Sequence, residues 1–594
     1  MQYSTGRAAP PAAEGTSPAG RRFRGRSPRK IKKGRSIMSE FFKKVAFGAL
    51  CVALSACTLS GCGDGSESSS LPKPEPKGTI VPTVYNVEEI VDADETEAGS
   101  IDAWTKEVFT SMGGNNDEPT KNAVIHCPYY TLNINGTEVP VYTARAGEGP
   151  HSFAWIDVTD NKRDFVLEVK LTTVAEYGKC VVLPESKGVT AEISGKEITA
   201  YITEFGSYSF TFNEKANDEV TDPTMEPLTI MVTEEVKIED VTPEGYEEVI
   251  IEPGYHEEMD LEFSEEEKVY RFKAGLHEIS SIRIPSNSVL YLDRGAYLKV
   301  TDRLVNGSYN TQTAIHTEDS VNVRMYGRGL LDCGELQGGA GKYKHVFNAT
   351  RVTDGIFEGL TIINANTWTM CMYHCDEVEV NRNLLLAYRT FSDGIMMSEC
   401  CDSSGRYNFV RTGDDGIEYK GTGWGNHRTG SDCIYEYNDV WSDKGTCYGL
   451  TWESECDMDG MIFRNNTIGF AQPVWTEGNN ALDCRLGTNP NVTWKNILFE
   501  NIEIYHCISF NIMQCETTGV GANLENVTFR NITVTSAEPG VRVFRMVCSP
   551  SNCSTSGIIL ENINFCGKII TPDDKADKTL FYYSTDQFED VVIK

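Results

Sequence analysis

Two acidic phrases contain the residues of this sequence that are best suited to chemistry. Ser392-Asp393-Gly394-Ile395 is followed 22 residues later by Asp414-Asp415-Gly416-Ile417. Carboxyl groups held close together repel one another's charge, so at least one is expected to keep its proton near neutral pH. A protonated acid beside an ionised base is what hydrolysis of a glycosidic bond requires. The spacing alone also allows a calcium site or a solvated acidic turn, and it does not decide between retaining and inverting chemistry.

A repeat in the second part of the chain explains the interval between the two phrases. An aromatic or Leu residue followed by x-Asn-Ile recurs at Phe499–Ile502, Phe529–Ile532 and Leu560–Ile563, at intervals of 30 and 31 residues. Periods of this length mark solenoids. Alternating apolar residues between Asn and Gly turns, without helical periodicity, predict a right-handed parallel β-helix over residues 266–594. The two acidic phrases are then expected on neighbouring coils.

The direction of the acidic side chains follows from the period of a strand. Side chains two residues apart share a face, so Asp393 and Asp415 would point into the core with the isoleucines that follow them. A core carboxylate would be very costly. We therefore expect a bend at Gly394 and Gly416, where glycine turns the chain at little steric cost, that exposes both carboxylates on the outer face.

The preceding part of the chain has a different pattern. Short alternating runs such as residues 164–171 and 207–212 are separated by Gly, Asp and Asn turns, which predicts an antiparallel β-sandwich over residues 83–265. A polar and Pro-rich segment over 62–82 is typical of a flexible tether. The expected fold class is all-β: an N-terminal β-sandwich followed by a pectin-lyase-like parallel β-helix.

Residues 1–61 have the features of an N-terminal extension and targeting signal. Met38 offers a second start, and Lys43-Lys44 precedes a short apolar run over residues 45–54. The small residues before Cys57 and Cys62 resemble a bacterial lipobox. We expect lipidation at Cys62, with Cys57 as the alternative, and hence a membrane contact through a lipid anchor and a location at the bacterial cell surface.

Charge and cysteine usage limit the partners. Residues 1–61 hold 12 of the 54 Lys and Arg and 2 of the 86 Asp and Glu, so the remainder carries a net charge of −42. Such an acidic body is a poor candidate for binding nucleic acid. The 16 cysteines beyond the signal lack paired zinc-ligand spacing, so no metal is expected. Pairs one repeat apart, such as Cys375 and Cys400, favour small apolar side chains stacked in a core, with some disulfides as the alternative.

A family resemblance rests on motifs in a fixed order. Ser392-Asp393-Gly394, then GDDGIEYK over residues 413–420, then CYGLTWESE over residues 447–455 resemble the polygalacturonases of glycoside hydrolase family 28. The resemblance covers about residues 265–570. The sandwich followed by a β-helix also resembles the dextranases and isopullulanases of family 49. In both families the resemblance implies inverting hydrolysis without a cofactor, with Asp414 as general acid and with Asp393 and Asp415 acting on water.

Departures from the family 28 pattern concern the substrate. Tyr448 stands where that family has a His, and Asp483-Cys484-Arg485 is the nearest match to its Arg-x-Lys. An ionised Asp483 would repel a uronate. A neutral glucan is therefore at least as plausible as a pectic glycan. The predicted substrate-binding residues are Lys420, Tyr448, Trp452 and Arg485, with Trp452 offering a face for sugar stacking.

The sequence thus predicts a monomeric extracellular glycoside hydrolase that cleaves a polysaccharide by acid/base chemistry with three Asp. A non-catalytic carbohydrate-binding β-helix protein is the main alternative, favoured by Tyr448 and Asp483. A polysaccharide lyase is less favoured, because it needs a calcium site and a basic residue, and the surroundings of Asp414 offer mainly acids.

Overall fold

The structure, a computed structural model, describes residues 73–95, 122–256, 260–302, 304–305, 308–309, 313–336, 344–422, 427–472, 480–487, 491–508, 511–548 and 553–594. The predicted signal, both candidate lipidation sites and most of the tether lie outside these residues. Within the described part of the chain, no helix is long and apolar enough to cross a membrane.

The first part of the described chain is the predicted β-sandwich. One sheet has the strand order β2-β5-β6-β12-β11-β8 with β1 added beside β6, and the other has the order β4-β3-β7-β10-β9. Alternate residues of both sheets, such as Ile134, Val169 and Phe210, bury a common core. The strands are β1 Ile80–Pro82, β2 Val124–His126, β3 Tyr130–Ile134, β4 Thr137–Val139, β5 Tyr142–Ala146, β6 Gly149–Val158, β7 Leu167–Thr173, β8 Lys179–Leu183, β9 Glu192–Ser194, β10 Glu197–Ile202, β11 Gly206–Asn213 and β12 Leu228–Glu234.

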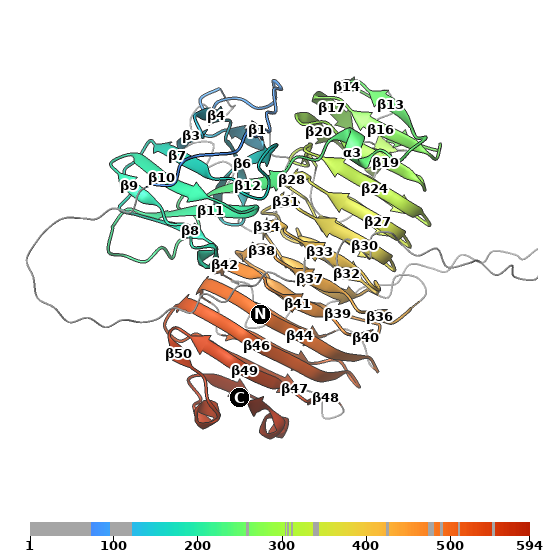
Figure 1. Cartoon of the computed structure of the whole chain (residues 1–594). Helices are drawn as coiled ribbons and strands as arrows, with labels where there is room; N and C mark the ends of the chain where they lie inside the picture. The colour runs from blue at the N-terminus through green and yellow to red at the C-terminus, as the bar shows by residue number, and fades with distance from the viewer. Residues whose placement is uncertain are drawn as a thin grey trace, which may run out of the picture. The chain divides into compact units, whose positions relative to one another are not determined.

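The second part is a right-handed parallel β-helix, as predicted, in which strands of successive coils pair side by side (Figure 1). The short helix α3, Ile238–Val241, precedes it. The sheet that carries the acidic phrases consists of β15 Asp260–Glu262, β18 Ser281–Arg283, β23 Ile315–Glu318, β26 Phe347–Thr350, β29 Met370–Tyr373, β32 Ile395–Ser398, β35 Ile417–Gly421, β39 Tyr448–Ser454, β43 Leu482–Leu486, β45 Asn511–Thr517, β47 Arg542–Cys548 and β51 Phe581–Tyr583.

A larger sheet forms the remaining sides of the coils, and its strands also pair in parallel between successive coils, except for β50, which pairs antiparallel with β49. Its strands are β13 Glu247–Ile251, β14 Gly254–Tyr255, β16 Lys268–Phe272, β17 Gly275–Ile279, β19 Ser288–Leu292, β20 Ala296–Val300, β24 Val321–Gly327, β25 Leu330–Asp332, β27 Thr353–Glu358, β28 Thr361–Ile363, β30 Asp376–Asn381, β31 Leu384–Leu386, β33 Ser404–Arg406, β34 Phe409–Thr412, β36 Gly430–Ser431, β37 Ile434–Glu436, β38 Asp439–Ser442, β40 Met458–Asp459, β41 Ile462–Arg464, β42 Thr467–Ala471, β44 Thr493–Cys507, β46 Asn523–Ala537, β48 Ser554–Ser556, β49 Ile559–Phe565, β50 Lys568–Ile569 and β52 Val592–Ile593. Strands β21 Leu304–Val305 and β22 Ser308–Tyr309 pair separately, and the 3-10 turns are η2 Glu185–Lys187, η3 Pro572–Ala576 and η4 Asp586–Asp590.

The repeated aromatic-x-Asn-Ile phrase is explained by this stacking. Phe499 pairs in register with Phe529, and their rings stack in the core with centroids 4.9 Å apart. Asn501 and Asn531 adopt a left-handed backbone conformation, which Asn tolerates better than most residues, and their side chains hydrogen-bond at 2.8 Å. Each copy of the phrase therefore fills the core and makes a turn at the same place in each coil.

A buried ladder of asparagines holds the coils together at another corner. The side-chain oxygen of Asn408 accepts from the backbone N–H of Asn383 at 2.9 Å, and Asn438 and Asn466 continue the ladder with the same bond in the next two coils. Buried polar groups are costly unless they are paired, and here each carboxamide meets a backbone group of the coil before it. The ladder thereby fixes the coil-to-coil register.

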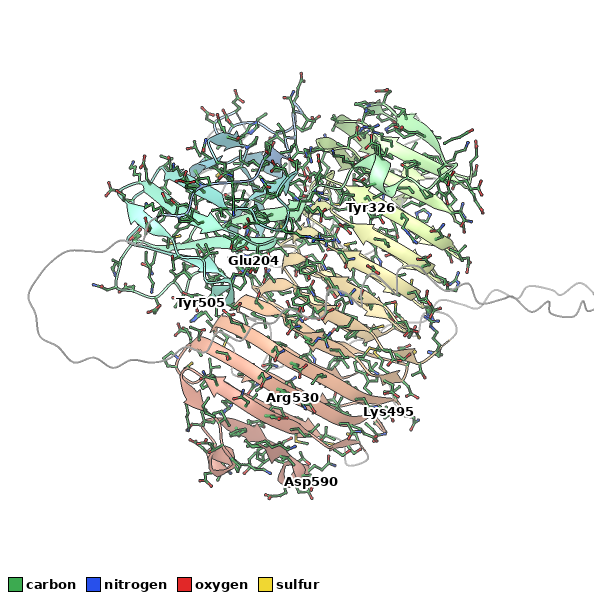
Figure 2. All side chains as sticks on the ribbon, in the orientation of Figure 1. Glu204, Tyr326, Lys495, Tyr505, Arg530 and Asp590 are labelled. Atoms are coloured by element: carbon green, nitrogen blue, oxygen red, sulfur yellow. The ribbon has the colours of Figure 1, made fainter. Side chains whose placement is uncertain are left out.

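Ion pairs follow the same register on the outer face. Arg530 of β46 lies between Glu500 of β44 and Glu561 of β49, at 3.0 Å from each (Figure 2). Exposed pairs of this kind contribute at most about 1 kcal/mol each. They support the alignment of neighbouring coils but do not determine it.

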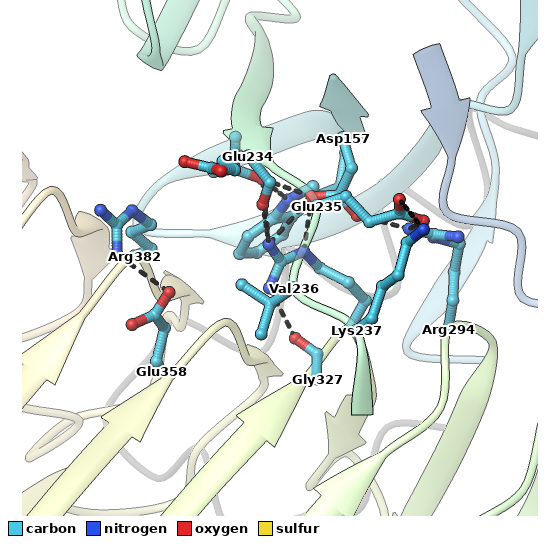
Figure 3. Close-up of polar contacts among 12 residues, drawn as sticks. Asp157, Glu234, Glu235, Val236, Lys237, Arg294, Gly327, Glu358 and Arg382 are labelled. Carbon is cyan, nitrogen blue, oxygen red and sulfur yellow. Dashed lines mark hydrogen bonds and ion pairs between the residues drawn. The ribbon is translucent and has the colours of Figure 1, made fainter. Parts of the chain in front are cut away.

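The sandwich packs against an apolar stripe on the outside of the β-helix. Aromatic residues of the sandwich, including Phe153 and Trp155, share a buried cluster with outward-facing residues of successive coils, namely Leu384, Phe409, Trp441 and Phe470. At the edge of this contact, the buried carboxylate of Asp157 pairs with Arg328 and Arg294, at 2.9 and 2.7 Å (Figure 3). The last sandwich strand ends at Glu234 and the β-helix sheet begins at Glu247, earlier than the expected boundary at 265.

The cysteines behave mainly as small core residues. The 16 described cysteines form no disulfide, and most of them are buried. Cys375 and Cys400 lie in the core of successive coils, as their spacing predicted, and Cys433 continues the row in the next coil. The disulfide alternative is therefore not supported among the described residues.

Candidate active site

The two acidic phrases lie on neighbouring coils, as predicted. Strand β32 pairs in parallel with β35, and Ile395 is in register with Ile417. Both isoleucines belong to the core, and Asp393 and Asp415 lie two residues before them at matching positions. The 22-residue interval is therefore one coil of the helix.

The glycines between them are required for a reason other than the one expected. Neither Gly394 nor Gly416 has a left-handed backbone, but a Cβ atom on Gly394 would lie 2.3 Å from the carbonyl oxygen of Gly416. A Cβ atom on Gly416 would lie 2.7 Å from the carbonyl oxygen of Cys447. The coils approach so closely here that only glycine fits, and this close approach brings the carboxylates of successive coils together.

The burial of the three carboxylates differs from the expectation. Asp393, Asp414 and Asp415 retain only 3%, 8% and 6% of their exposed area, rather than standing in solvent on the outer face. The physical reason is that neighbouring groups supply the polar contacts that water would otherwise supply. The cost of burying these carboxylates is reduced by hydrogen bonds and by a buried ammonium group.

Asp414 is held by the backbone. Its two carboxyl oxygens accept hydrogen bonds from the N–H of Phe391 at 3.1 Å and from the N–H of its own neighbour Asp415 at 3.0 Å. Burial, together with the charges of Asp393 and Asp415, raises the pKa of Asp414 well above its ordinary value. Asp414 therefore holds its proton to higher pH than an exposed aspartate, which suits a general acid.

Asp393 and Lys420 form a buried ion pair. The Nζ atom of Lys420 lies 3.0 Å from Asp393 Oδ2, 2.9 Å from Glu453 and 3.4 Å from Glu418. Burial raises the pKa of Asp393 to about 7, although Lys420 acts against the rise. Burial alone would lower the pKa of Lys420, but the surrounding carboxylates raise it well above its usual value. The ammonium group thus stays charged.

Glu418 is a fourth acid of the cluster, and sequence reasoning missed it. Its side chain is fully buried, it accepts a short hydrogen bond from the Thr451 hydroxyl, and burial raises its pKa well above the ordinary value. Carboxyl oxygens of Asp393, Asp415 and Glu418 lie within 4.8 Å of one another. The available signal was strand periodicity, because Glu418 lies two residues before Lys420 in β35 and so shares its face.

The carboxylate of Asp415 faces the following coil. Its Oδ1 atom accepts a hydrogen bond from the backbone N–H of Thr446 at 2.6 Å. The site therefore combines an acid that holds its proton, Asp414, with a carboxyl group, Asp415, that is bound to the backbone of the next coil.

Asp483 and Arg485 lie further along the same sheet. Asp483 accepts a hydrogen bond from Gln514 at 3.0 Å, and burial raises its pKa to about 8 despite the nearby Arg485. At neutral pH this carboxyl is mostly neutral, which weakens the argument that Asp483 would repel a uronate. The guanidinium of Arg485 lies 5.3 Å from the centre of the Trp452 ring, a cation–π distance.

The remaining predicted binding residues divide into two groups. Trp452 is 43% exposed, so its indole face is accessible beside Arg485. Tyr448 is fully buried in the helix core, and its hydroxyl donates to the carbonyl of Asn438 at 2.7 Å. The expected substrate contact of Tyr448 is therefore wrong, because the first residue of β39 points inward and packs against Phe463.

Fold and site together define the class: a β-sandwich and parallel β-helix protein whose neighbouring coils carry a buried cluster of acids around one lysine. No protein-family model matches the sequence, and no curated protein matches it. Among solved structures, Dex49A from Penicillium minioluteum is similar, with a TM-score of 0.56 and 13% identity over 81% of this chain and 96% of Dex49A.

Other solved structures resemble the chain less. The polygalacturonase from Erwinia carotovora has a TM-score of 0.40 at 13% identity, over 56% of this chain and 90% of its own. The exopolygalacturonase from Thermotoga maritima has a TM-score of 0.37 at 14% identity, over 56% and 87%. The resemblance to family 49 expected from the order of sandwich and helix is confirmed as a resemblance of fold, and it leaves the chemistry to be argued from the residues.

Proposed function

We propose that this protein is a glycoside hydrolase that cleaves a polysaccharide by acid/base hydrolysis. The observation that carries the proposal is the convergence of Asp393, Asp414 and Asp415 from neighbouring coils, where burial raises the pKa of Asp414 well above its ordinary value. Pairs of acids whose pKa values are pushed apart are the usual arrangement for cleaving an acetal.

The three aspartates have separate roles in this proposal. Asp414 donates its proton to the glycosidic oxygen as the bond from the anomeric carbon to that oxygen breaks. Asp415 accepts a proton from the attacking water, and Asp393, held by Lys420, orients that water. The water oxygen becomes bonded to the anomeric carbon on the opposite face, so the product has inverted configuration. Asp414 is then reprotonated from solvent and Asp415 releases its proton.

The substrate is proposed to be a neutral glucan or a pectic glycan. Trp452 offers an exposed aromatic face on which a sugar ring can stack, and Arg485 lies beside it. The buried ammonium of Lys420 is fully engaged by acids, so we assign it to the acid cluster rather than to a substrate carboxylate. We further propose that the enzyme is monomeric and is held at the bacterial cell surface through a lipid on Cys62.

A carbohydrate-binding protein without chemistry is the second candidate. The observation that favours it is Tyr448, which replaces the family's His and points into the core, so this position supplies no titratable group to the site. In this case Trp452 and Arg485 would bind a glycan and the acid cluster would leave it intact.

The test is the release of reducing ends from a panel of polygalacturonate, dextran, pullulan and mixed plant glycans. Asp414→Asn is the site variant, and Asp432→Asn, an exposed aspartate beyond β36, is the matched control. We expect one glycan to be cleaved by the native chain and by the control, with a loss of at least about 100-fold in the site variant. Glycan binding without cleavage would replace the proposal with the second candidate.

A further inference from the structure

A second cluster of titratable side chains lies beyond the other ends of the strands that carry the acid cluster. His374 follows β29, Glu399 follows β32 and Cys456 follows β39, while His427 lies shortly before β36. Asp393 and Glu399 are on opposite sides of β32, and six residues of extended chain span about 20 Å. The second cluster is therefore separate from the proposed active site.

Three potential ligand atoms converge in this cluster. The Cys456 sulfur lies 2.7 Å from Glu399 Oε1 and 3.0 Å from His427 Nδ1, and the three groups each have a ligand atom within 4.8 Å of the others. The second oxygen of Glu399 lies 2.7 Å from Nε2 of His374. Glu399 and Cys456 are buried, and His427 is exposed.

The sulfur contacts are shorter than those of the other core thiols. Cys375, Cys400 and Cys433 donate to backbone carbonyl oxygens of neighbouring coils at 3.3 to 3.4 Å. The Cys456 thiol instead donates to the side chain of Glu399 and also lies against the imidazole of His427, so these two partners are side chains that can bind a metal and not backbone carbonyls. Such a convergence of a thiol, a carboxylate and an imidazole is the donor set of a zinc site.

We propose that Glu399, His427 and Cys456 bind a zinc ion, and that His374 fixes the second oxygen of Glu399. Zinc takes sulfur at about 2.3 Å and nitrogen or oxygen at about 2.0 to 2.2 Å, which places neighbouring ligand atoms about 3.4 Å apart. The three groups need to separate only slightly to reach this geometry. A thiolate and a carboxylate together balance the charge of Zn²⁺ in a buried position, and a second residue that holds a ligating carboxylate in place, as the close contact of His374 does here, is usual.

His427 is the exposed member of the proposed site. The other charged group at this place, Arg428, donates to the backbone carbonyls of Glu399 and Cys375 and pairs with Asp376. The guanidinium of Arg428 is thus already engaged by two backbone carbonyls and by Asp376. The ion would join segments that follow three different coils, so it would stabilise this edge of the β-helix. The spacing of the sequence predicted no metal, because the ligands are 28 and 29 residues apart along the chain.

The experiment measures zinc in the purified full chain by elemental mass spectrometry, and then the absorption spectrum after chelation and reloading with Co²⁺. We expect about one zinc per chain and a thiolate-to-cobalt charge-transfer band. His427→Ala should reduce the bound metal at least tenfold, and circular dichroism checks that this variant, changed at an exposed position, keeps its fold. Cys456→Ser should abolish the charge-transfer band.

Cys401→Ser is the matched control, since Cys401 lies two residues beyond Glu399 and donates to the carbonyl of Thr429. It should keep the metal and the band. A native chain that binds no zinc after reloading, or that loses none in the His427→Ala variant, would overturn the proposal and leave a hydrogen-bonded cluster only. None of these readouts depends on glycan cleavage, so they stand apart from the proposed function.

Discussion

Replacing Asp393 by Asn should stabilise the protein at alkaline pH while removing the proposed activity. Burial raises the pKa of Asp393 from 3.8 to about 7. A carboxyl whose folded-state pKa is raised contributes its full stability below the unfolded-state pKa and loses it as pH rises through the folded-state value. The native chain therefore loses stability between about pH 4 and pH 7 through this residue, whereas the Asp393→Asn variant has no charge to bury at this position.

The magnitude follows from the same two values. A difference of about three pH units corresponds to about 4 kcal/mol of unfolding free energy, which is an upper bound because the amide also gives up the pairing of Asp393 with Lys420. Near pH 4 the Asp393→Asn variant should have the same free energy of unfolding as the native chain. As the pH rises, its free energy of unfolding should increase relative to that of the native chain, and above pH 8 it should be higher by up to about 4 kcal/mol.

Urea unfolding of both chains at several pH values between about 4 and 9 measures this difference. Asp402→Asn, which changes an exposed aspartate of the same coil, controls for the chemical exchange itself. A difference in unfolding free energy that stays constant across this range would refute the claim that Asp393 is buried at a cost. Cleavage of the glycan by the Asp393→Asn variant at the native rate would refute the role of Asp393 in orienting water.

Three further outcomes can be checked with the same assays. Lys420→Met should lower the unfolding free energy by about 3 to 5 kcal/mol at pH 7.5, because the buried carboxylates around it lose their counter-ion. The loss should be smaller at pH 5, where these carboxylates protonate more readily. An equal loss at the two pH values would contradict the ion pairing. Tyr448→Phe should cost about 1 to 2 kcal/mol, through the lost bond to Asn438, and leave glycan cleavage unchanged; a selective loss of cleavage would contradict its core position. Gly416→Ala should lower the unfolding free energy by about 1 to 3 kcal/mol, and with it the midpoint of thermal unfolding, because the added Cβ clashes with the carbonyl of Cys447. An unchanged midpoint would argue against the close approach of the coils.

The order of elements could be predicted from the sequence because each has a repeating physical signature. The phrase that contains Phe499 and recurs 30 residues later at Phe529 places an aromatic ring in the core and a left-handed Asn at the turn of each coil. Both features can be recognised in the sequence from the residue types alone. The interval between Asp393 and Asp415 gave the length of a coil and therefore their proximity. Periodicity is a local property, so a single sequence is enough to read it.

The environment of the site could not be predicted in the same way. Burial of Asp393 depends on the ammonium of Lys420 and on Glu453, which belongs to a later coil. The inward direction of Tyr448 depends on where β39 begins, and a motif match carries no information about that register. A family motif indicates which residue types meet, whereas the coil register determines which side each residue faces.

The apolar stripe beneath the sandwich has a consequence for how such a protein can evolve. Leu384, Phe409, Trp441 and Phe470 point out of the coil and are covered only because the sandwich lies over them. A gene fragment that encoded the coils alone would produce a protein with an extended exposed hydrophobic patch, which would make it prone to aggregation. We therefore expect the two halves to be inherited as a pair, because an unrelated module in place of the sandwich would leave these side chains uncovered.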